Sequence, residues 1–343
     1  MSYSELPQKI LIRTRGNHQQ GMGDLVGSEA LARACLSQGI KVAVLAEPDP
    51  EALTYLQDAR LTHFPAGSLS HDCQIVREWA PDCLVVNLLR SAPEYLEALR
   101  PLVKLLVTLD DDGPAAALAD LCINPLYPIP GSLDSPAFIP LKSEFQKLNR
   151  RSRAWRPEVE RILVTLGGAD TYGFSPLVVR ALATIPEGIW ITVILGPAFR
   201  HFAEMQTALK DWAGRPFVLE HYVTEMGRYL IAADLAICSG GLTLFEMACV
   251  GTPAVVVCGE PFEVATASRL AKQGFGVNLG FGEDCTEGAI HRAVMELIND
   301  KAGRAAMGRR GRELVDGRGA PRSLEAICKK WRAAVNNTPV RVA

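Results

Sequence analysis

The sequence has 343 residues, of which 48% are hydrophobic and 22% are charged, and its formal net charge is -2. This length suits two α/β domains of ordinary size, and the composition allows each domain to bury a core. A net charge this close to zero excludes a surface that attracts nucleic acid or anionic lipid over its whole area. We therefore expect no nucleic-acid partner and at most peripheral membrane contact.

The nine cysteines give no sign of a metal site, because none forms a Cys-x-x-Cys pair and no histidine cluster has ligand spacing. Several lie in apolar runs, where a free cysteine behaves as a small buried hydrophobe. The N-terminal segment lacks a signal-peptide layout, and no apolar stretch reaches the ~18 residues of a spanning helix. These features predict a reduced, cytoplasmic protein without a bound metal or cofactor.

Short apolar runs alternate with amphipathic stretches along almost the whole chain. The expected strands are 10–13, 41–46, 84–87, 105–109, 121–123, 161–166, 189–195, 217–219, 235–238 and 254–258. The expected helices are 27–38, 51–58, 70–79, 93–99, 176–183, 202–214, 225–233, 243–250, 263–273, 287–299, 302–314 and 321–336. Strands interleaved with helices in this way indicate βαβ units and parallel sheets.

The pattern of strand, glycine-rich turn, helix and strand begins at residue 10 and begins again at residue 161. The restart predicts an α/β protein of two doubly wound, Rossmann-like domains. We expect an N-terminal domain over 1–148, a C-terminal domain over 158–320, and a helix at 321–336 that crosses back to the first domain. The basic run 147–156 (KLNRRSRAWR) is expected to be a solvated linker; contact with an anionic acceptor is the alternative.

The most informative segment is 238–246 (CSGGLTLFE), which joins an apolar run to an expected helix. Gly240 and Gly241 let the backbone approach a ligand, and the first N–H groups of the helix point at it. Thr243 or Ser239 is expected to cap the helix or to add a hydroxyl contact. Glu246, one turn into the helix, has the position to accept hydrogen bonds from ribose. An ordinary strand-to-helix turn is the alternative interpretation.

A second glycine pair, Gly167-Gly168, follows the first strand of the same half. Ligands of open α/β sheets lie beyond the carboxyl ends of the strands, so both turns would surround one phosphorylated ligand. The turn after the chain's first strand carries Gly21, Gly23 and Gly27. That spacing differs from Gly-x-Gly-x-x-Gly and argues against a nicotinamide or flavin site.

These motifs resemble known families. The segment 240–246, Gly251-Thr252-Pro253 and the later Gly274 are similar to the nucleotide-binding half of GT-B glycosyltransferases of the family-28 type. A resemblance over nearly the whole chain is to the UDP-sugar hydrolase of pseudaminic acid biosynthesis and its relatives in spore-coat polysaccharide operons. The resembling pieces are Ile12-Arg13, Gly21-Met22-Gly23, Leu109-Asp110-Asp111, 140–145, 166–170 and 239–246.

The resemblance implies a GT-B fold, in which two Rossmann-like domains face each other across a cleft and the C-terminal domain holds UDP. The residues that it assigns to the nucleotide and its phosphates are Gly23, Gly167, Gly168, Tyr222, Val223, Ser239, Gly240, Gly241, Leu242, Thr243 and Glu246. Within this set, the backbone near Tyr222 would meet the base. Glu263 stands where relatives usually carry a glutamine that contacts the sugar.

Two residues of the N-terminal half complete the expected sugar and acceptor site. Arg13 ends the first strand and is expected to face the cleft, with Arg15 close behind it. Asp110 begins an Asp-Asp-Asp run that either orients substrate or binds a metal. We favour a role in shaping the cleft, because helix dipoles and basic side chains stabilise the leaving diphosphate in GT-B enzymes without a metal.

One departure from the hydrolase relatives concerns the catalytic base. They carry a Gly-His pair in the first turn, and this sequence has Gly23-Asp24 there, with Gly27 in place of a following arginine. An aspartate is a weak base at neutral pH, since its usual pKa is ~3.9, unless burial raises that pKa. Asp24 is the candidate base, and His18 on the same turn is an alternative.

The predicted function is glycosyl transfer from a nucleotide-activated sugar, with UDP as the expected carrier, in surface glycan or polysaccharide biosynthesis. Hydrolysis of a UDP-sugar by a replaced base is one alternative. A catalytically idle subunit that binds a nucleotide sugar for a partner enzyme is the other. The sequence does not determine the sugar, the acceptor or the oligomeric state.

Overall fold

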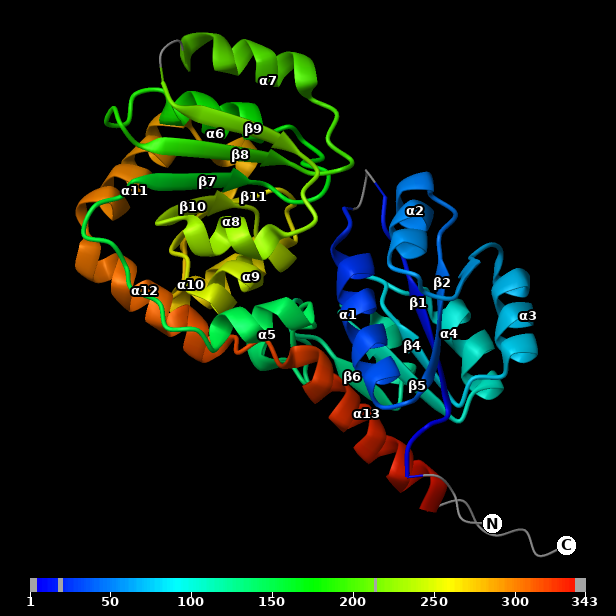
Figure 1. Ribbon diagram of the computed structural model, residues 1–343. Coiled ribbons are helices and arrows are strands. Elements are labelled where there is room, and N and C mark those ends of the chain that lie inside the picture. The colour runs from blue at the N-terminus through cyan, green and yellow to red at the C-terminus, as the bar shows by residue number, and fades with distance from the viewer. Residues whose placement is uncertain (1–4, 18–20, 213–214, 337–343) are drawn as a thin grey trace, which may run out of the picture. The chain divides into compact units, whose positions relative to one another are not determined.

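The computed structural model describes residues 5–17, 21–212 and 215–336 (Figure 1). The chain forms two compact units. Unit 1 takes its described residues from Met1–Gly16, Asp24–Lys142 and Arg318–Ala343, and unit 2 from Asn17–Gly23 and Ser143–Gly317. The stretch between the two expected domains, residues 149–157, therefore lies within unit 2.

Unit 1 is built on a six-stranded sheet in the order β3-β2-β1-β4-β5-β6, and all its neighbouring strands are parallel. The strands are β1 Lys9–Thr14, β2 Lys41–Ala46, β3 His63–Pro65, β4 Cys83–Val86, β5 Leu105–Leu109 and β6 Leu121–Ile123. The helices are α1 Gly23–Ser37, α2 Pro50–Asp58, α3 Leu69–Trp79, α4 Pro93–Leu99 and α13 Gly319–Asn336, with short 3-10 turns η1 Arg100–Leu102, η2 Pro114–Leu118 and η3 Pro136–Phe138.

Unit 2 is built on a second six-stranded parallel sheet in the order β12-β11-β10-β7-β8-β9. The strands are β7 Arg161–Thr165, β8 Trp190–Leu195, β9 Phe217–His221, β10 Leu235–Cys238, β11 Ala254–Cys258 and β12 Val277–Phe281. The helices are α5 Ser143–Asn149, α6 Ser175–Leu182, α7 Phe202–Leu209, α8 Met226–Ala232, α9 Leu242–Val250, α10 Glu263–Lys272, α11 Glu287–Asn299 and α12 Lys301–Leu314, with η4 Lys210–Trp212 and η5 Gly282–Asp284.

The two sheets have the same topology. Numbered within its own unit, each has the doubly wound order 3-2-1-4-5-6, which confirms the predicted fold class. The strand order reverses between β1 and β4 in unit 1 and between β7 and β10 in unit 2. In unit 2, Thr165 at the end of β7 pairs with Cys238 at the end of β10, so the turns after these strands start side by side.

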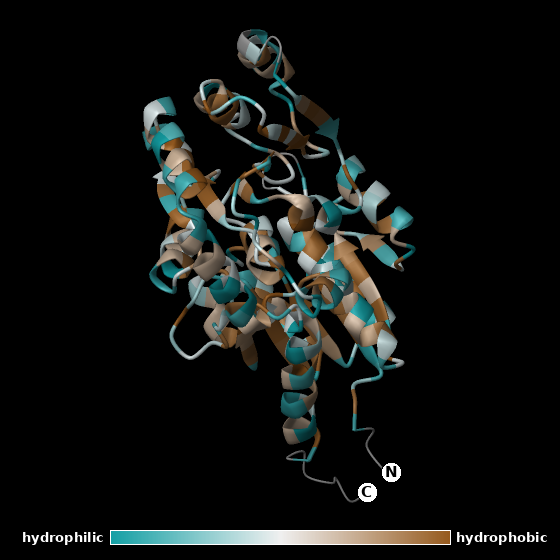
Figure 2. Ribbon diagram, turned by 60° about the vertical axis from the view of Figure 1, so that its left-hand side comes forward, coloured by the Kyte–Doolittle hydropathy of each residue, from teal (hydrophilic) through white to brown (hydrophobic). Residues whose placement is uncertain are grey.

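The central strands explain the continuous apolar runs of the sequence. Parallel strands that are covered on both faces need apolar side chains at every position. Every residue of β4 (CLVV), β5 (LLVTL) and β11 (AVVVC) is buried. Figure 2 shows the same contrast, with brown hydrophobic strands beside helices that carry both brown and teal residues.

The sequence missed two of the four edge strands, β3 and β12, because neither is a buried apolar run. The strand β3 has three residues, all partly or fully exposed, and β12 (VNLGF) is half-buried throughout and contains Gly280. The helix α1 begins at Gly23, four residues before its expected start. Gly27 lies inside α1, and a Cβ there would lie only 3.2 Å from Pro140 Cγ, so glycine suits this close contact.

The last helix belongs to unit 1, where α13 packs against β5, β6 and η3. The buried residues of α13 include Leu324, Ile327 and Trp331. None of the helices in the described part of the chain is long and apolar enough to cross a membrane.

Candidate functional site

Three turns of unit 2 meet at the switch point of its sheet. They follow β7, β10 and β11, and they contain Gly167, Ser239 and Gly259 respectively. A Cβ on Gly167 would lie 3.4 Å from Ser239 Oγ, and a Cβ on Gly259 would lie 3.6 Å from Ser239 Cβ. Gly167 has φ +91°, a left-handed conformation that favours glycine. The structure therefore brings together the two glycine turns that the sequence singled out.

The helix α9 starts directly from the turn after β10. Its N-cap is Gly241, and no side chain caps it, so the expected capping by Thr243 or Ser239 is wrong. Leu242 and Thr243 form the partly exposed first turn. Because backbone N–H groups at a helix start carry a partial positive charge, an uncapped start of this kind suits an anionic ligand.

The residues expected to bind ribose and base lie on the same sheet edge. Glu246 is in the second turn of α9 and is buried, with 8% of its surface exposed. Tyr222 and Val223 follow the carboxyl end of β9, and Tyr222 has φ +56° with its N–H donating to Leu195 O at 2.9 Å. The tyrosine side chain is exposed. Contacts of these residues with a nucleotide stay predictions.

Glu263 joins two of the three turns. Its Oε2 accepts hydrogen bonds from the backbone N–H groups of Gly259 at 2.8 Å and Gly240 at 3.0 Å, and from Glu260 N–H at 3.4 Å. The side chain is buried, and burial raises its pKa to about 7 against the opposing effect of these N–H donors. The structure thus gives Glu263 a role in holding the turns, which sequence reasoning missed. Contact with the sugar stays a prediction.

Two further residues that the sequence did not single out support the turn after β7. Asp170 accepts hydrogen bonds from Phe174 N–H and Ser175 N–H, each at 2.8 Å, and so caps α6. Gly196, after β8, packs so closely that a Cβ there would overlap the carbonyl groups of Gly167 and Gly168. The Gly-Pro dipeptide at 196–197 was the only sign of this contact in the sequence.

In unit 1, Asp24 lies at the corresponding switch point, in the first turn of α1. Its Oδ2 lies 2.9 Å from Arg15 Nε, just past the end of β1. Asn87, which follows β4, donates from Nδ2 to Asp24 O at 2.8 Å and to Ser28 Oγ at 3.0 Å. Burial raises the pKa of Asp24 above the usual aspartate range, and the Arg15 charge opposes this rise. Gly23 is the first residue of the helix, and His18 lies outside the described residues.

Arg13 does not have the position that the sequence predicted. Its guanidinium lies in a buried network, with Nε 3.4 Å from Asp72 Oδ2 and donating to Tyr95 Oη at 3.1 Å. Tyr95 Oη in turn donates to Asp72 Oδ2 at 2.7 Å. Asp72 has no exposed surface and Arg13 only 7%. The arginine therefore balances a buried carboxylate, which explains why a buried cation stands in this strand.

Tyr95→Phe is expected to lower the free energy of unfolding by about 1–3 kcal/mol, because it removes a hydroxyl that bonds to two buried charged groups. Chemical denaturation monitored by circular dichroism measures this change. Tyr229→Phe is the control, since its hydroxyl bonds near the surface, and it should stay within about 0.5 kcal/mol of wild type. Equal stability of the two variants would contradict the role given to the Arg13 network.

The aspartate run shapes its loop. Asp110 has φ +52°, and its Oδ1 accepts from Leu126 N–H at 2.8 Å. Asp111 accepts from Ser91 N–H at 3.2 Å and Gly113 N–H at 2.8 Å, and Asp112 pairs with Arg90 at 2.8 Å. Within the described ranges, no three His, Cys, Asp or Glu side chains group as a metal site. Sugar binding by Asp110 stays a prediction.

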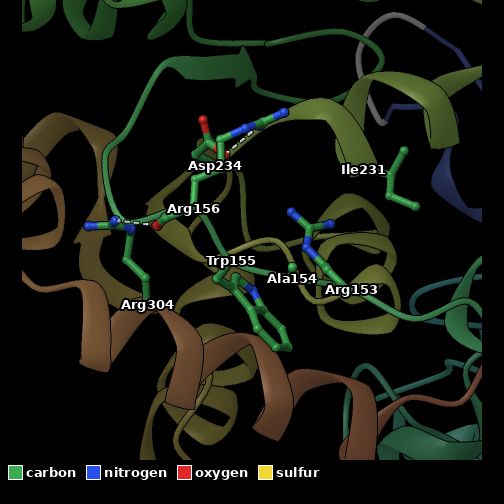
Figure 3. A pocket seen from close by; sticks show the side chains of 7 residues that line it. All are labelled: Arg153, Ala154, Trp155, Arg156, Ile231, Asp234 and Arg304. Carbon is green, nitrogen blue, oxygen red and sulfur yellow. Dashed lines mark hydrogen bonds and ion pairs between the residues drawn. The ribbon is translucent and has the colours of Figure 1, made fainter.

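The basic run 147–156 is not simply a solvated linker: Lys147, Arg150 and Arg151 are exposed, but other side chains of the run bind the rest of unit 2. Arg153 donates to Ala233 O at 2.7 Å and Val250 O at 3.1 Å, and Trp155 Nε1 donates to Gly251 O at 2.8 Å. These residues line a pocket with Arg156, Asp234 and Arg304, and Figure 3 shows Arg156 reaching Asp234. Asp234 precedes β10, so this pocket lies at the amino edge of the sheet, opposite the glycine turns.

Two doubly wound units, one of them with convergent glycine turns at its switch point, are the architecture of the GT-B fold class. Residues 161–313 match the glycosyltransferase family 28 C-terminal domain. The matched part contains the six strands of the unit 2 sheet and most of the helices of that unit. The fold is thus that of GT-B enzymes, and the C-terminal unit is similar to the family-28 glycosyltransferase domain.

Individual proteins are also similar to this chain. The chain is 25% identical to the spore coat polysaccharide biosynthesis protein SpsG of Bacillus subtilis (strain 168), over 89% of this chain and 93% of that protein. It is 31% identical to the UDP-N-acetylglucosamine–N-acetylmuramyl-(pentapeptide) pyrophosphoryl-undecaprenol N-acetylglucosamine transferase of Acidothermus cellulolyticus, over 52% of each chain. The spinosyn rhamnosyltransferase SpnG complexed with thymidine diphosphate superposes with a TM-score of 0.65 at 17% identity, covering 93% of this chain and all of that one.

Proposed function

We propose that the protein transfers a sugar from a nucleoside diphosphate carrier, UDP, to an acceptor hydroxyl in the synthesis of a polysaccharide or other surface glycan. The convergence of the turns after β7, β10 and β11 at the switch point of a family-28 domain carries this proposal. The names of the relatives support it, since one acts in spore coat polysaccharide biosynthesis and another uses UDP-N-acetylglucosamine.

The diphosphate would bind against the glycine turns and the uncapped start of α9. Gly167, Gly240 and Gly241 allow the phosphate oxygens to approach the backbone, and the first N–H groups of α9 stabilise negative charge there. Glu246 would accept hydrogen bonds from the ribose, and the backbone near Tyr222 would meet the base. We propose that no metal ion is needed, because these N–H groups stabilise the leaving diphosphate.

Asp24 would act as the general base. Its carboxylate takes the proton from the acceptor hydroxyl while the hydroxyl oxygen attacks the anomeric carbon of the sugar. The bond from that carbon to the diphosphate oxygen breaks, and UDP leaves into the glycine-turn pocket. The raised pKa of Asp24 supports this role, because a base works best when its pKa is close to the working pH.

A thermal-shift screen with UDP, thymidine diphosphate, GDP and ADP tests the donor class. A ligand at a hundredfold excess over its dissociation constant stabilises the folded state by about 2.7 kcal/mol, and we expect this for UDP. If none of the diphosphates protects the protein, the proposed nucleotide site is wrong.

Release of UDP from candidate UDP-sugars then tests the reaction. We expect release to depend on an added acceptor. Rapid release without acceptor would mean that the protein is a hydrolase. Tight UDP binding with no release from any donor, with or without acceptors, would favour a binding subunit.

A further inference from the structure

A buried carboxylate lies against a backbone N–H group of the proposed diphosphate pocket. Glu263 is the first residue of α10, and its Oε2 accepts the Gly240 N–H at 3.0 Å and the Gly259 N–H at 2.8 Å. Its Oε1 lies beside the next glycine, since a Cβ built on Gly241 would be 2.8 Å from that atom. An anionic side chain thus already occupies the start of the glycine turn that leads into α9.

A bound diphosphate and the Glu263 carboxylate would repel each other strongly at this turn. The Gly240 N–H cannot donate fully to both a carboxylate and a diphosphate, and like charges in a buried site are unfavourable. The titratable groups that interact with Glu263 are Glu260 on the same turn, Cys238 at the end of β10 and Cys258 at the end of β11. All of them are neutral or negative, so none offsets a second negative charge.

We propose that Glu263 couples donor binding to proton uptake: it holds the turns after β10 and β11 as a carboxylate in the free protein, and it takes one proton from solvent when the diphosphate binds. This inference rests on the proposed function, because it assumes that a nucleoside diphosphate binds at these turns. Protonation removes the repulsion and leaves the carbonyl oxygen of the acid to hold one of the two turns. The Gly240 N–H is then released to the phosphate.

The pKa of Glu263 lies close to neutral pH, where ligand binding can change the protonation state of the side chain. Burial raises the pKa of this carboxyl to about 7, and the neighbouring Glu260 adds to the rise. At pH 7 the free protein therefore contains both forms, the carboxylate predominates at higher pH, and a bound diphosphate would favour the protonated form. Above pH 7, each further unit of pH should weaken binding up to about tenfold, because one proton must be taken up.

Calorimetric titration of UDP between pH 7.0 and 8.5 tests the coupling. We expect the dissociation constant of the wild type to rise at least about fivefold over this interval. Ionisation of UDP itself works the other way, since its terminal phosphate has a pKa of about 6 and only gains charge as the pH rises. A rise in the dissociation constant therefore has to come from the protein.

Glu263→Gln is expected to bind UDP with a dissociation constant that hardly changes over the same interval. Glu260→Gln is the matched control, because it removes the neighbouring carboxylate and leaves the bonds of Glu263 in place. That variant should keep the rise, shifted to lower pH. A flat profile in the wild type, or an unchanged rise in Glu263→Gln, would overturn the proposal.

Proton uptake by the wild type tests the proposed coupling even if Glu263→Gln fails to fold. Binding heats at pH 7.5 in buffers of different ionisation enthalpy should show uptake of more than about half a proton per UDP bound. Uptake of no proton, or proton release, would refute the coupling while UDP binding itself stands. If UDP and the other diphosphates bind at no pH, the proposed function fails, and this inference fails with it.

Discussion

Asp24→Asn is expected to lower kcat for glycosyl transfer about 10²- to 10⁴-fold, the usual contribution of a general base. Asparagine keeps the size of the side chain and can still bond to Arg15, but it cannot take a proton from the acceptor. Because the donor would bind to unit 2, the dissociation constant of UDP should stay unchanged. Steady-state rates together with UDP calorimetry measure both quantities.

The pH dependence of kcat/KM is a second test of Asp24 as the general base. A base must be ionised to act, so kcat/KM should rise with pH through the pKa of Asp24, which burial moves above the usual aspartate range. Arg15→Met removes the cation that opposes this rise, so its ascending limb should move to higher pH. Asp112→Asn is the control and should leave the pH profile unchanged. Like Asp24, Asp112 is a carboxylate paired with an arginine, but its partner Arg90 lies at the surface of the same unit. Full activity of Asp24→Asn would assign the base to another residue.

Gly196→Ala is expected to weaken UDP binding more than about tenfold and to destabilise unit 2 by about 1–3 kcal/mol. The added methyl group would overlap the carbonyl groups of Gly167 and Gly168, so the turn after β7 would have to move. Rigid backbone atoms make this overlap harder to relieve than a clash with a flexible side chain. Calorimetry with UDP and thermal denaturation measure the two effects.

Gly288→Ala provides the matched control. A Cβ at Gly288 would meet nothing within 4 Å, and the residue lies in the first turn of α11. Alanine there should be neutral, or stabilising by up to about 1 kcal/mol, because glycine is the poorer helix former. If Gly196→Ala binds UDP as tightly as Gly288→Ala does, the turn after β7 is not part of the donor site.

The donor half of the candidate site was largely readable from the sequence. Strand, glycine pair and helix are local features, and their position at the carboxyl end of parallel strands follows from the alternation of strands and helices. The pairing of Thr165 with Cys238 then brings the two turns together, as predicted. The edge strands β3 and β12 were missed, since they are partly exposed and lack the apolar run that marks a central strand.

Charged residues were harder to place, because a charge in a sequence does not show whether its partner lies in the solvent, in a ligand or in the core. Arg13 was expected in a ligand site, and it neutralises Asp72, which is 59 residues away in the chain. Arg153 and Trp155 were expected in a linker, and they bind carbonyl groups of unit 2. Such partners depend on packing between distant segments, which residue order alone does not reveal.

The sequence by itself determined two doubly wound domains and the neighbouring glycine turns at Gly167 and Gly240, because periodicity and glycine turns act over short distances. Only the tertiary structure decided what surrounds those turns. It showed Gly196 packed under the turn after β7, and it placed the carboxylate of Glu263 on the N–H groups of Gly240 and Gly259. Those contacts join residues from different βα units, and so they exist only once the strands have paired.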